Sequence, residues 1–457
     1  MMTESQRAAL AEYAAVKGQC PARERLAALF DDGVYTETGS NLRAGENLAG
    51  VVTAYGYIGG TPAYAFSQDS TVMKGAVSLA HSAKICKMFE LAARNGVPVV
   101  GIYDSCGAFV EDGADALNAY SDILLSMGSL SGVVPMVSVI SGVCAGTMAM
   151  IASSADFSVI TEGAELYLDA SGNNASAESA AKSGAVSAYA KSDAEAMDTV
   201  RRYLSLMPQN NLSPLPEFEF DAPVSAAFDN AENAAESIAD AGSILEVYGE
   251  YGTASYTALC TVSGVTAGIA ATNKTKDKLT SADCSKIARF VRLCDAYSIP
   301  VITVADTEGF DLAGADMVRA GAALAGAYAE ASCAKIALVS GKACGMAYIA
   351  FAGRNVAADA VYALPEAVIA PMDPVSAAEF LYHDKLKGAD DLAAARAQIA
   401  KEYAENEGSA FAAAAKGAAD EVVTAENVRA AVASVLDVTA GKRLNKRLPK
   451  KHNILPL

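Results

Sequence analysis

Residues Lys84 to Gly107 read KICKMFELAARNGVPVVGIYDSCG, and residues Lys286 to Gly309 read KIARFVRLCDAYSIPVITVADTEG. In the first half of each stretch, apolar residues recur three and four positions apart, which places them on one face of a helix. An apolar run rich in Val and Ile follows, typical of a buried strand. The sequence therefore predicts the same helix and strand twice, at a constant offset of 202 residues.

The repetition extends on both sides of these stretches. A strand hairpin with Gly-containing turns precedes each one, at residues 51–69 and 258–273, and a helix opening on Gly-Ala-Asp follows each one. Another apolar strand then runs into SGVCAGTMAM at 141–150 or SGKACGMAYI at 340–349. Such a doubled order indicates a tandem duplication. Four prolines in residues 206–225 predict the linker, so we expect domains at 1–215 and 216–457.

Composition excludes several classes of function. The net charge of −18 opposes binding to nucleic acid, and the basic run at 441–452 is either a solvated tail or a local anion site. Nine cysteines without a CxxC pair predict neither a disulfide framework nor a zinc ribbon. The N-terminus does not resemble a secretory signal, so we expect a cytoplasmic protein. The uncharged residues 123–155 are interrupted by Gly, Ser and Pro, and predict a buried strand, a turn and a helix rather than a membrane span.

The repeated Ser-Gly-x-x-x-Gly step carries the predicted chemistry. A strand that ends in a Gly turn and restarts as a helix leaves backbone N–H groups without partners, and such groups bind negative charge. If that charge develops on an oxygen during a reaction, the turn is an oxyanion hole. The alternative is that the glycines only allow the helix to pack closely on its strand. The candidate donors are Ala145, Gly146 and Thr147 in the first copy and Gly345, Met346 and Ala347 in the second.

Side chains near the two turns leave further alternatives open. Asp104 and Asp306 follow a strand in each copy and are either general bases or turn caps. Cys144 and Cys344 have no histidine nearby in the sequence, which disfavours a thiol nucleophile. The chain has only three histidines, which disfavours triad chemistry and a metal centre.

Several ordered segments resemble the carboxyltransferase β-type subunits of biotin-dependent acyl-CoA carboxylases and decarboxylases. The opening ARERLAALFDDG at 22–33 is similar to the start of that family. The resemblance continues through the SLAHSAKI segment ending at Ile85, CAG at 144–146, RRYLSLMPQNN at 201–211, CGMAY at 344–348 and the final PKKHNILPL. The ordered series covers nearly the whole chain and is more specific than any single motif.

The resemblance implies an α/β fold of two tandem crotonase-like ββα-spiral domains, the first for an acyl-CoA and the second for biotin. It assigns the enolate oxyanion to the amides of Gly146 and Thr147, and the biotin ureido oxyanion to those of Gly345 and Met346. It further implies that substrate is contacted by Cys106, Gly107, Ala108, Ala145, Gly309, Phe310 and Ala347.

The same resemblance implies the partners. No Met-Lys-Met tripeptide among small residues occurs in the chain, so biotin arrives on a separate biotin carboxyl carrier protein. Biotin carboxylase or sodium-pumping decarboxylase subunits complete such complexes, and the latter would link the chain to a membrane. A hexamer built as a trimer of dimers is the expected assembly.

The chain departs from the family in its loops. Cys106 and Phe109 replace a glycine and an arginine, Thr147 and Met346 each replace a glycine, and residues 172–197 and 307–314 differ as well. Two alternatives therefore stay open. One is an inactive scaffold subunit, and the other is a biotin-independent crotonase-like hydratase, isomerase or hydrolase that uses Asp104 or Glu111 as its base.

Overall fold

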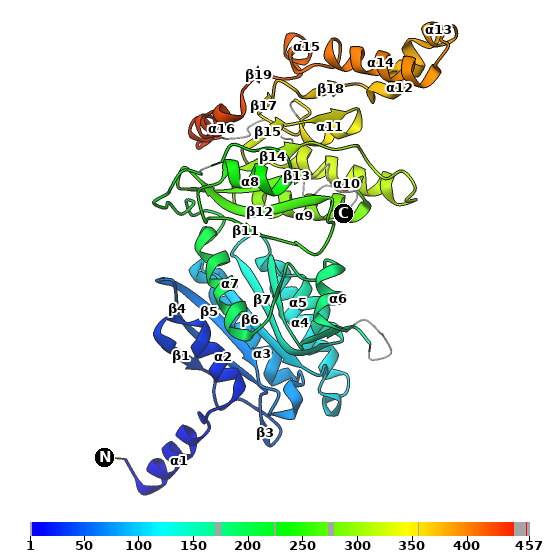
Figure 1. Cartoon of the computed structure of the whole chain (residues 1–457). Coiled ribbons are helices and arrows are strands. Elements are labelled where there is room, and N and C mark those ends of the chain that lie inside the picture. Colours follow the sequence, from blue (N-terminus) through cyan, green and yellow to red (C-terminus); the bar gives the residue numbers. More distant parts are fainter. Residues whose placement is uncertain are drawn as a thin grey trace. The chain divides into compact units, whose positions relative to one another are not determined.

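The computed structural model describes residues 2–169, 175–223, 225–272, 278–354, 356–442 and 454. The chain divides into two compact units, Met1–Pro214 and Leu215–Leu457 (Figure 1). Each unit is a sheet of mostly parallel strands covered by helices. The basic run that we expected to be a tail or an anion site lies outside the described residues except for its first two positions.

The first unit begins with a helix and alternates strands and helices from the first hairpin onward. Its helices are α1 Glu4–Ala15, α2 Pro21–Leu29, α3 Leu79–Asn95, α4 Asp115–Leu130, α5 Thr147–Ser153, α6 Ala177–Lys182 and α7 Asp193–Leu206, with short 3₁₀ turns at Asp31–Gly33, Met73–Gly75 and Val110–Asp112. Its strands are β1 Tyr35–Thr38, β2 Arg43–Ala44, β3 Asn47–Leu48, β4 Val51–Ile58, β5 Thr61–Gln68, β6 Val99–Ser105, β7 Met136–Ala145, β8 Phe157–Thr161, β9 Glu165–Tyr167 and β10 Ala188–Ala190.

The sheet of the first unit has the order β1-β4-β5-β6-β7-β8-β10. The hairpin β4–β5 is antiparallel, whereas β5, β6, β7, β8 and β10 run parallel to one another. Strand β9 pairs with the far end of β7, beyond the place where β8 leaves it. The carboxyl ends of β6 and β7 therefore meet at one edge of the sheet.

The second unit repeats this order. Its helices are α8 Ala231–Ile238, α9 Ser281–Ala296, α10 Met317–Glu330, α11 Met346–Phe351, α12 Pro374–Leu381, α13 His383–Leu386, α14 Leu392–Glu405, α15 Ala410–Ala415 and α16 Ala425–Thr439. Its strands are β11 Leu245–Glu246, β12 Ser255–Val262, β13 Val265–Thr272, β14 Val301–Ala305, β15 Lys335–Val339, β16 Lys342–Cys344, β17 Ala360–Ala363, β18 Val368–Ala370 and β19 Glu421–Val422.

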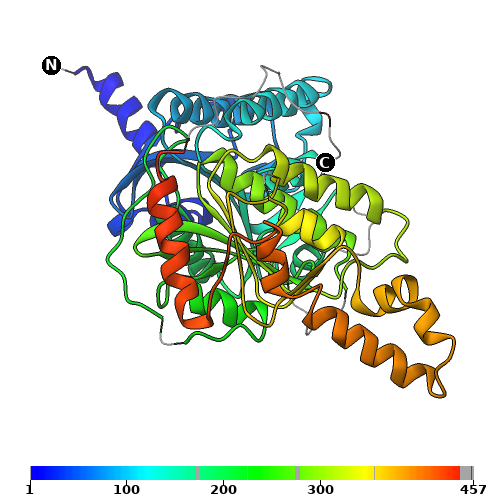
Figure 2. The same ribbon diagram turned by 90° about the horizontal axis from the view of Figure 1, so that it is seen from above.

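The main sheet of the second unit has the order β11-β12-β13-β14-β15-β17-β19, and β16 pairs with β18 in a separate two-stranded ladder. Helices α12 to α14 form an arm that extends outward from the rest of this unit, whereas α15 packs back against β18 and β19 (Figure 2). The predicted helices, hairpins and strands of both copies are confirmed, and so is the strand, turn and helix expected at 123–155. In the part of the chain that the structure describes, no helix has the length and apolarity needed to cross a membrane.

Each copy fastens its first long helix to the hairpin with a buried lysine. Lys84 of α3 donates to the carbonyl of Val51, and Lys286 of α9 donates to the carbonyl of Ser255 at 2.8 Å. Burial lowers the pKa of each lysine to about 8. The two lysines are 202 residues apart, so they occupy equivalent positions in the two copies and their buried hydrogen bonds are also duplicated.

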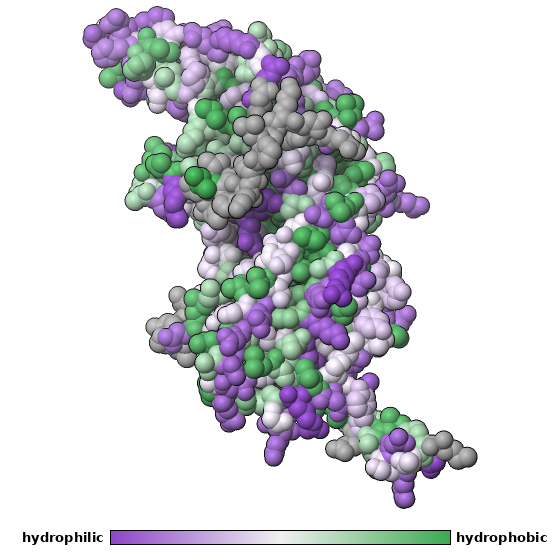
Figure 3. All heavy atoms as spheres, turned by 180° about the vertical axis from the view of Figure 1, so that it is seen from behind, coloured by the Kyte–Doolittle hydropathy of each residue, from purple (hydrophilic) through white to green (hydrophobic). Residues whose placement is uncertain are grey.

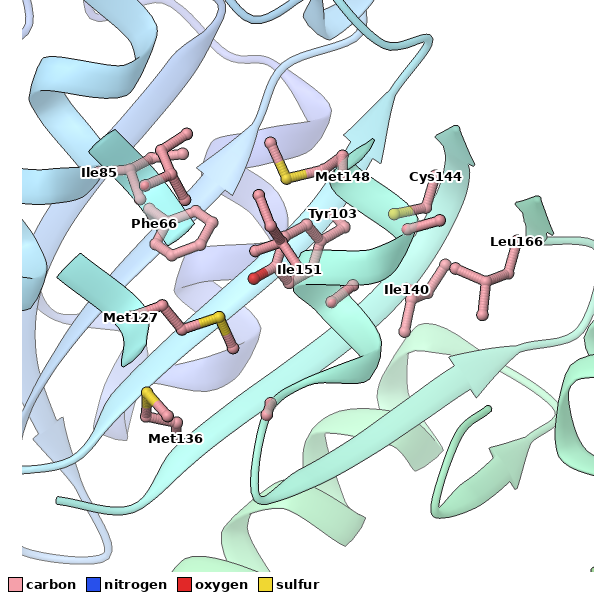
Figure 4. Packing of buried hydrophobic residues seen from close by; sticks show 14 of the residues in the cluster. Phe66, Ile85, Tyr103, Met127, Met136, Ile140, Cys144, Met148, Ile151 and Leu166 are labelled. Carbon is pink, nitrogen blue, oxygen red and sulfur yellow. The ribbon is translucent and has the colours of Figure 1, made fainter. Parts of the chain in front are cut away.

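The core of the first unit holds the short helix α5 in place. Met148 and Ile151 of α5 are fully buried, and Figure 4 shows them among Phe66, Tyr103 and Cys144. Burying a side chain of this size contributes roughly 1.5–3 kcal/mol. A helix of only seven residues would not be stable alone, so this packing fixes its N-terminus at the end of β7.

Candidate active site

In the first unit, the loop that begins at the end of β6 lies beside the turn that begins at the end of β7. Ser105 at the end of β6 pairs in parallel with Cys144 near the end of β7. Gly107 has φ +115°, a conformation that strongly favours glycine, and a Cβ built on it would lie 3.9 Å from the carbonyl oxygen of Ala145. The predicted substrate residues 106–108 and the predicted donors 145–147 therefore come together.

The Gly146 amide is not a free donor, which corrects the expectation from the sequence. It donates to the carbonyl of Tyr167 at 2.9 Å and so extends the β7–β9 ladder by one bond. Gly146 has φ +66° and turns the chain from strand to helix. Its conformation shapes the turn, and the donors lie elsewhere.

Three amides near this turn have no acceptor among the described residues. Two belong to Thr147 and Met148 in the first turn of α5, where no preceding helical carbonyl is available. The third belongs to Ala108, because its neighbours Gly107 and Phe109 make the bonds to Val77 on either side. Sequence reasoning missed Met148 as a donor, although the helix start at Thr147 could have indicated it.

The second unit repeats this arrangement. The Gly345 amide donates to the carbonyl of Ala370 at 2.9 Å, so the same correction applies there. Among the described residues, the amides of Met346 and Ala347 in α11 and of Phe310 after β14 have no acceptor. Gly309 has φ +102° and donates to Thr307 Oγ1 at 3.1 Å, as Gly107 donates to Ser105 Oγ at 3.2 Å.

The structure accommodates Thr147 and Met346, the two positions where the resemblance implies glycine. Neither Thr147 nor Met346 has a positive φ, so a Cβ is accommodated at both positions. Both side chains are exposed, and each N–H survives the substitution. Cys106, which also replaces a glycine, is likewise exposed and has no positive φ.

Asp104 and Asp306 have structural partners. Asp104 is buried and accepts from Arg25 at 3.0 Å and from the Ser70 hydroxyl at 2.8 Å. Asp306 is also buried and accepts from the backbone N–H of Lys342 at 2.8 Å. These contacts favour the turn-cap interpretation over the general base.

Arg25 connects three segments around the first turn, and sequence reasoning did not single it out. From α2 it contacts Asp104 near the end of β6, donates to the carbonyl of Ser141 in β7 at 3.0 Å, and pairs with Asp193 at the start of α7 at 3.2 Å. Its position within the ARERL motif was the available signal.

Cys144 and Cys344 are not poised as nucleophiles. Burial raises the pKa of the Cys144 thiol, and the Asp104 carboxylate raises it further. Burial also raises the pKa of Cys344. A thiol held protonated is a poor nucleophile, so the expectation from the sequence agrees with the geometry.

Two α/β units, each with unpaired amides beside a strand-to-helix turn, have the arrangement expected of an enzyme that stabilises oxyanions through its backbone. The chain belongs to the carboxyl transferase domain family, whose model matches residues 14–455. It is 33% identical to the methylmalonyl-CoA decarboxylase subunit alpha of Propionigenium modestum, over 96% of this chain and 94% of the relative. It is also 33% identical to the methylmalonyl-CoA carboxyltransferase 12S subunit of Propionibacterium freudenreichii subsp. shermanii, over 96% and 92%.

The fold comparison agrees with the family. The structure of transcarboxylase 12S with methylmalonyl-coenzyme A and methylmalonic acid bound matches with a TM-score of 0.91 and 31% identity, over 100% of this chain and 99% of that one. The crotonase-like fold expected from the sequence is thereby confirmed, as is membership of a carboxyltransferase family.

Proposed function

We propose that this protein transfers a carboxyl group between biotin on a separate carrier protein and an acyl-CoA of the propionyl or methylmalonyl type. The observation that carries the proposal is the pair of turns with unpaired amides, one in each unit of a chain that belongs to the carboxyl transferase domain family. Unpaired amides at both turns also favour an active enzyme over an inactive scaffold.

In the first unit the amides of Thr147, Met148 and Ala108 would stabilise the enolate oxygen of the thioester. These donors are fixed by the buried side chains of α5 and by the β-bridge between Val77 and Ala108, so they need no reorganisation during the reaction. Gly146, Gly107, Ala145 and Cys106 would shape the surrounding pocket.

In the second unit the amides of Met346, Ala347 and Phe310 would donate hydrogen bonds to the biotin ureido oxygen, and Gly345 and Gly309 would shape that turn. The unpaired N–H groups fit such an oxygen because each offers a donor and no acceptor. Biotin would supply the nitrogen that carries the carboxyl group and, once that group has left, a base for the α-proton. A base supplied by biotin is consistent with the structural roles of Asp104 and Asp306, because neither carboxylate would then be needed as a general base.

We also propose that the chain assembles into a hexamer with partner subunits that supply the biotin carrier. A related structure is described as a hexamer assembly. Exposed apolar side chains lie on the segments that follow β6 and β14 and on α11: Val110, Leu117 and Leu125 in the first unit and Leu312, Val318 and Ile349 in the second. Figure 3 shows apolar patches between hydrophilic ones in both units.

Thr147→Pro tests the first amide pocket directly. Proline suits the first position of a helix, so it removes the N–H while preserving the fold. Removing one such donor lowers the rate about 100- to 1000-fold. We therefore expect that fall in the decarboxylation of methylmalonyl-CoA with free biotin, measured as released CO₂.

Thr147→Ala is the matched control, because it removes the side chain and keeps the amide. We expect it to stay within a few-fold of the wild-type rate. Equal rates for the proline and alanine variants, with unchanged thermal unfolding, would show that this amide does not serve the reaction. A wild-type chain that is inactive with propionyl-CoA-type and longer acyl-CoA substrates, with or without biotin, would favour the inactive scaffold.

A further inference from the structure

A cluster of three charged side chains lies beside the turn of the second unit. The ammonium of Lys342 contacts the carboxylates of Glu308, at 2.6 Å, and of Asp373. Lys342 begins β16, Glu308 lies in the loop after β14, and Asp373 caps the N-terminus of α12. One side chain therefore joins three segments that are separate in the sequence.

The cluster is partly buried at its centre. The Lys342 side chain is 22% exposed, whereas Asp373 and Glu308 are 37% and 56% exposed. Burial would lower the pKa of Lys342, but its hydrogen bonds to Asp373 and Glu308 outweigh burial and raise that pKa. The lysine is therefore a fixed cation at neutral pH. Asp373 is held a second time, because it accepts from the Val375 amide at 2.9 Å.

The backbone of Lys342 makes further contacts with the same loop. Its N–H donates to Asp306 and its carbonyl accepts from the Thr307 amide, both at 2.8 Å. Glu308 stands two residues before the unpaired amide of Phe310, and Lys342 stands four residues before that of Met346. Lys342 therefore ties together the two segments that carry the donors of the second pocket.

Among the described residues of the first unit, the corresponding turn has no such cluster. Val143 occupies the position of Lys342 in the repeated motif, and Cys106 occupies that of Glu308. The duplicated fold thus builds a strand, turn and helix without this cation. Because the common fold does not need this contact, its presence in the second copy is better explained by a role in binding the ligand of that copy.

We propose that Lys342 is a positioning residue for the second pocket, which it shapes by holding the Glu308 loop and the start of α12 against the Met346 turn. The inference rests on the function proposed above, in which this pocket receives biotin. Without the ammonium, two carboxylates would face each other at short range and repel. The Phe310 amide would then move away from those of Met346 and Ala347.

Lys342→Met tests the proposal, because it keeps the length of the side chain and removes the charge. In the decarboxylation of methylmalonyl-CoA with free biotin, we expect kcat/KM for biotin to fall about 10- to 100-fold, since small misplacements of donors have effects of that size. Affinity for CoA, measured by calorimetry, should stay within twofold. Amide hydrogen exchange should become faster at residues 306–312 and 371–376.

Two further variants and one control separate positioning from loss of fold. Lys342→Arg keeps the charge and should recover most of the activity with biotin. Glu308→Gln removes one of the two carboxylates that would repel each other. It should therefore lower kcat/KM for biotin less than Lys342→Met does, and it tests the proposal even if Lys342→Met folds poorly. Lys387→Met removes the ammonium of an exposed pair with Asp384 in the same unit and should match the wild type.

Unchanged kinetics with biotin in Lys342→Met, when the wild type is active, would overturn the role of Lys342. So would an equal loss of CoA binding, or Lys342→Arg behaving like Lys342→Met. Failure of the proposed function has a different signature: the wild type itself would then show no biotin-dependent reaction, whatever the variants do.

Discussion

At the scale of single residues, the glycines of the repeated motif make room for a carboxylate. A Cβ on Gly142 would lie 2.3 Å from Asp104 Oδ1, and a Cβ on Gly341 would lie 2.2 Å from Asp306 Oδ1. Distances this short do not occur between a real Cβ and an oxygen. The first glycine of each Ser-Gly-x-x-x-Gly step is therefore required by close approach, whereas the second is required by its positive φ.

Gly142→Ala should destabilise the protein by about 1–3 kcal/mol, the usual range for overpacking a buried site. Asp104 cannot retreat easily, because Arg25 and Ser70 both hold it. Chemical denaturation followed by circular dichroism measures the free energy of unfolding. Gly128→Ala in α4 is the control, since no atom lies within 4 Å of its Cβ position.

The control should be stabilised by up to about 1 kcal/mol, because alanine is favoured over glycine within a helix. If both variants have the same stability, the carboxylate does not fill the space that Gly142 leaves. Sequence reasoning offered a turn cap as one role for Asp104, and the contacts favour that role. Sequence reasoning did not predict that Asp104 packs against Gly142, the glycine of the same copy.

At the scale of secondary-structure elements, helix α2 braces the first turn through one side chain. Arg25 reaches the ends of β6 and β7 and the start of α7, and its side chain is only 13% exposed. A partly buried arginine with two carboxylate partners fixes the relative position of the strands that carry Ala108 and Thr147. This helix therefore contributes to the geometry of the site by holding these segments together.

Arg25→Met should destabilise the protein by about 3–5 kcal/mol, because it leaves the buried Asp104 carboxylate without its cation. It should also lower CoA affinity, since the strand ends are no longer held together. Thermal unfolding and calorimetry with CoA measure the two effects.

Arg201→Met provides the comparison, because Arg201 pairs with Asp31 in the same unit and both side chains are about 30% exposed. We expect a loss of about 1 kcal/mol or less and normal CoA binding. If Arg25→Met destabilised the protein no more than Arg201→Met does, the contacts around Asp104 would contribute little to the free energy of unfolding.

At the scale of the whole molecule, duplication produced two similar units. They differ beside the turns at which we propose that different ligands bind. Both keep the buried lysine, the hairpin, the Gly turn and the unpaired amides. Among the described residues, only the second has the Lys342 cluster and the helical arm α12–α14. Both units also carry exposed apolar side chains, which are the surfaces that the proposed hexamer would cover.

Leu117→Glu should dissociate the proposed hexamer, because a charge placed in an apolar interface is costly to bury. Leu117 is 68% exposed in the single chain, so the fold itself should keep its stability. Light scattering coupled to size-exclusion chromatography measures the mass. Leu212→Glu, at a 91% exposed position in the linker, should leave the mass unchanged. A variant at Leu117 that keeps the full mass would place the interface elsewhere.

The sequence alone determined the duplicated order of helices and strands, the carboxyltransferase family and the two turns, because these depend on periodicity and on motifs that are local in the chain. The tertiary structure decided which amides are available. The amides of Gly146 and Gly345 donate to the carbonyls of Tyr167 and Ala370, which belong to strands later in the chain. Arg25 meets Asp104 across 79 positions, and Lys342 meets Asp373 on another loop. Such pairings depend on how strands and helices pack in space, and a linear pattern does not encode them.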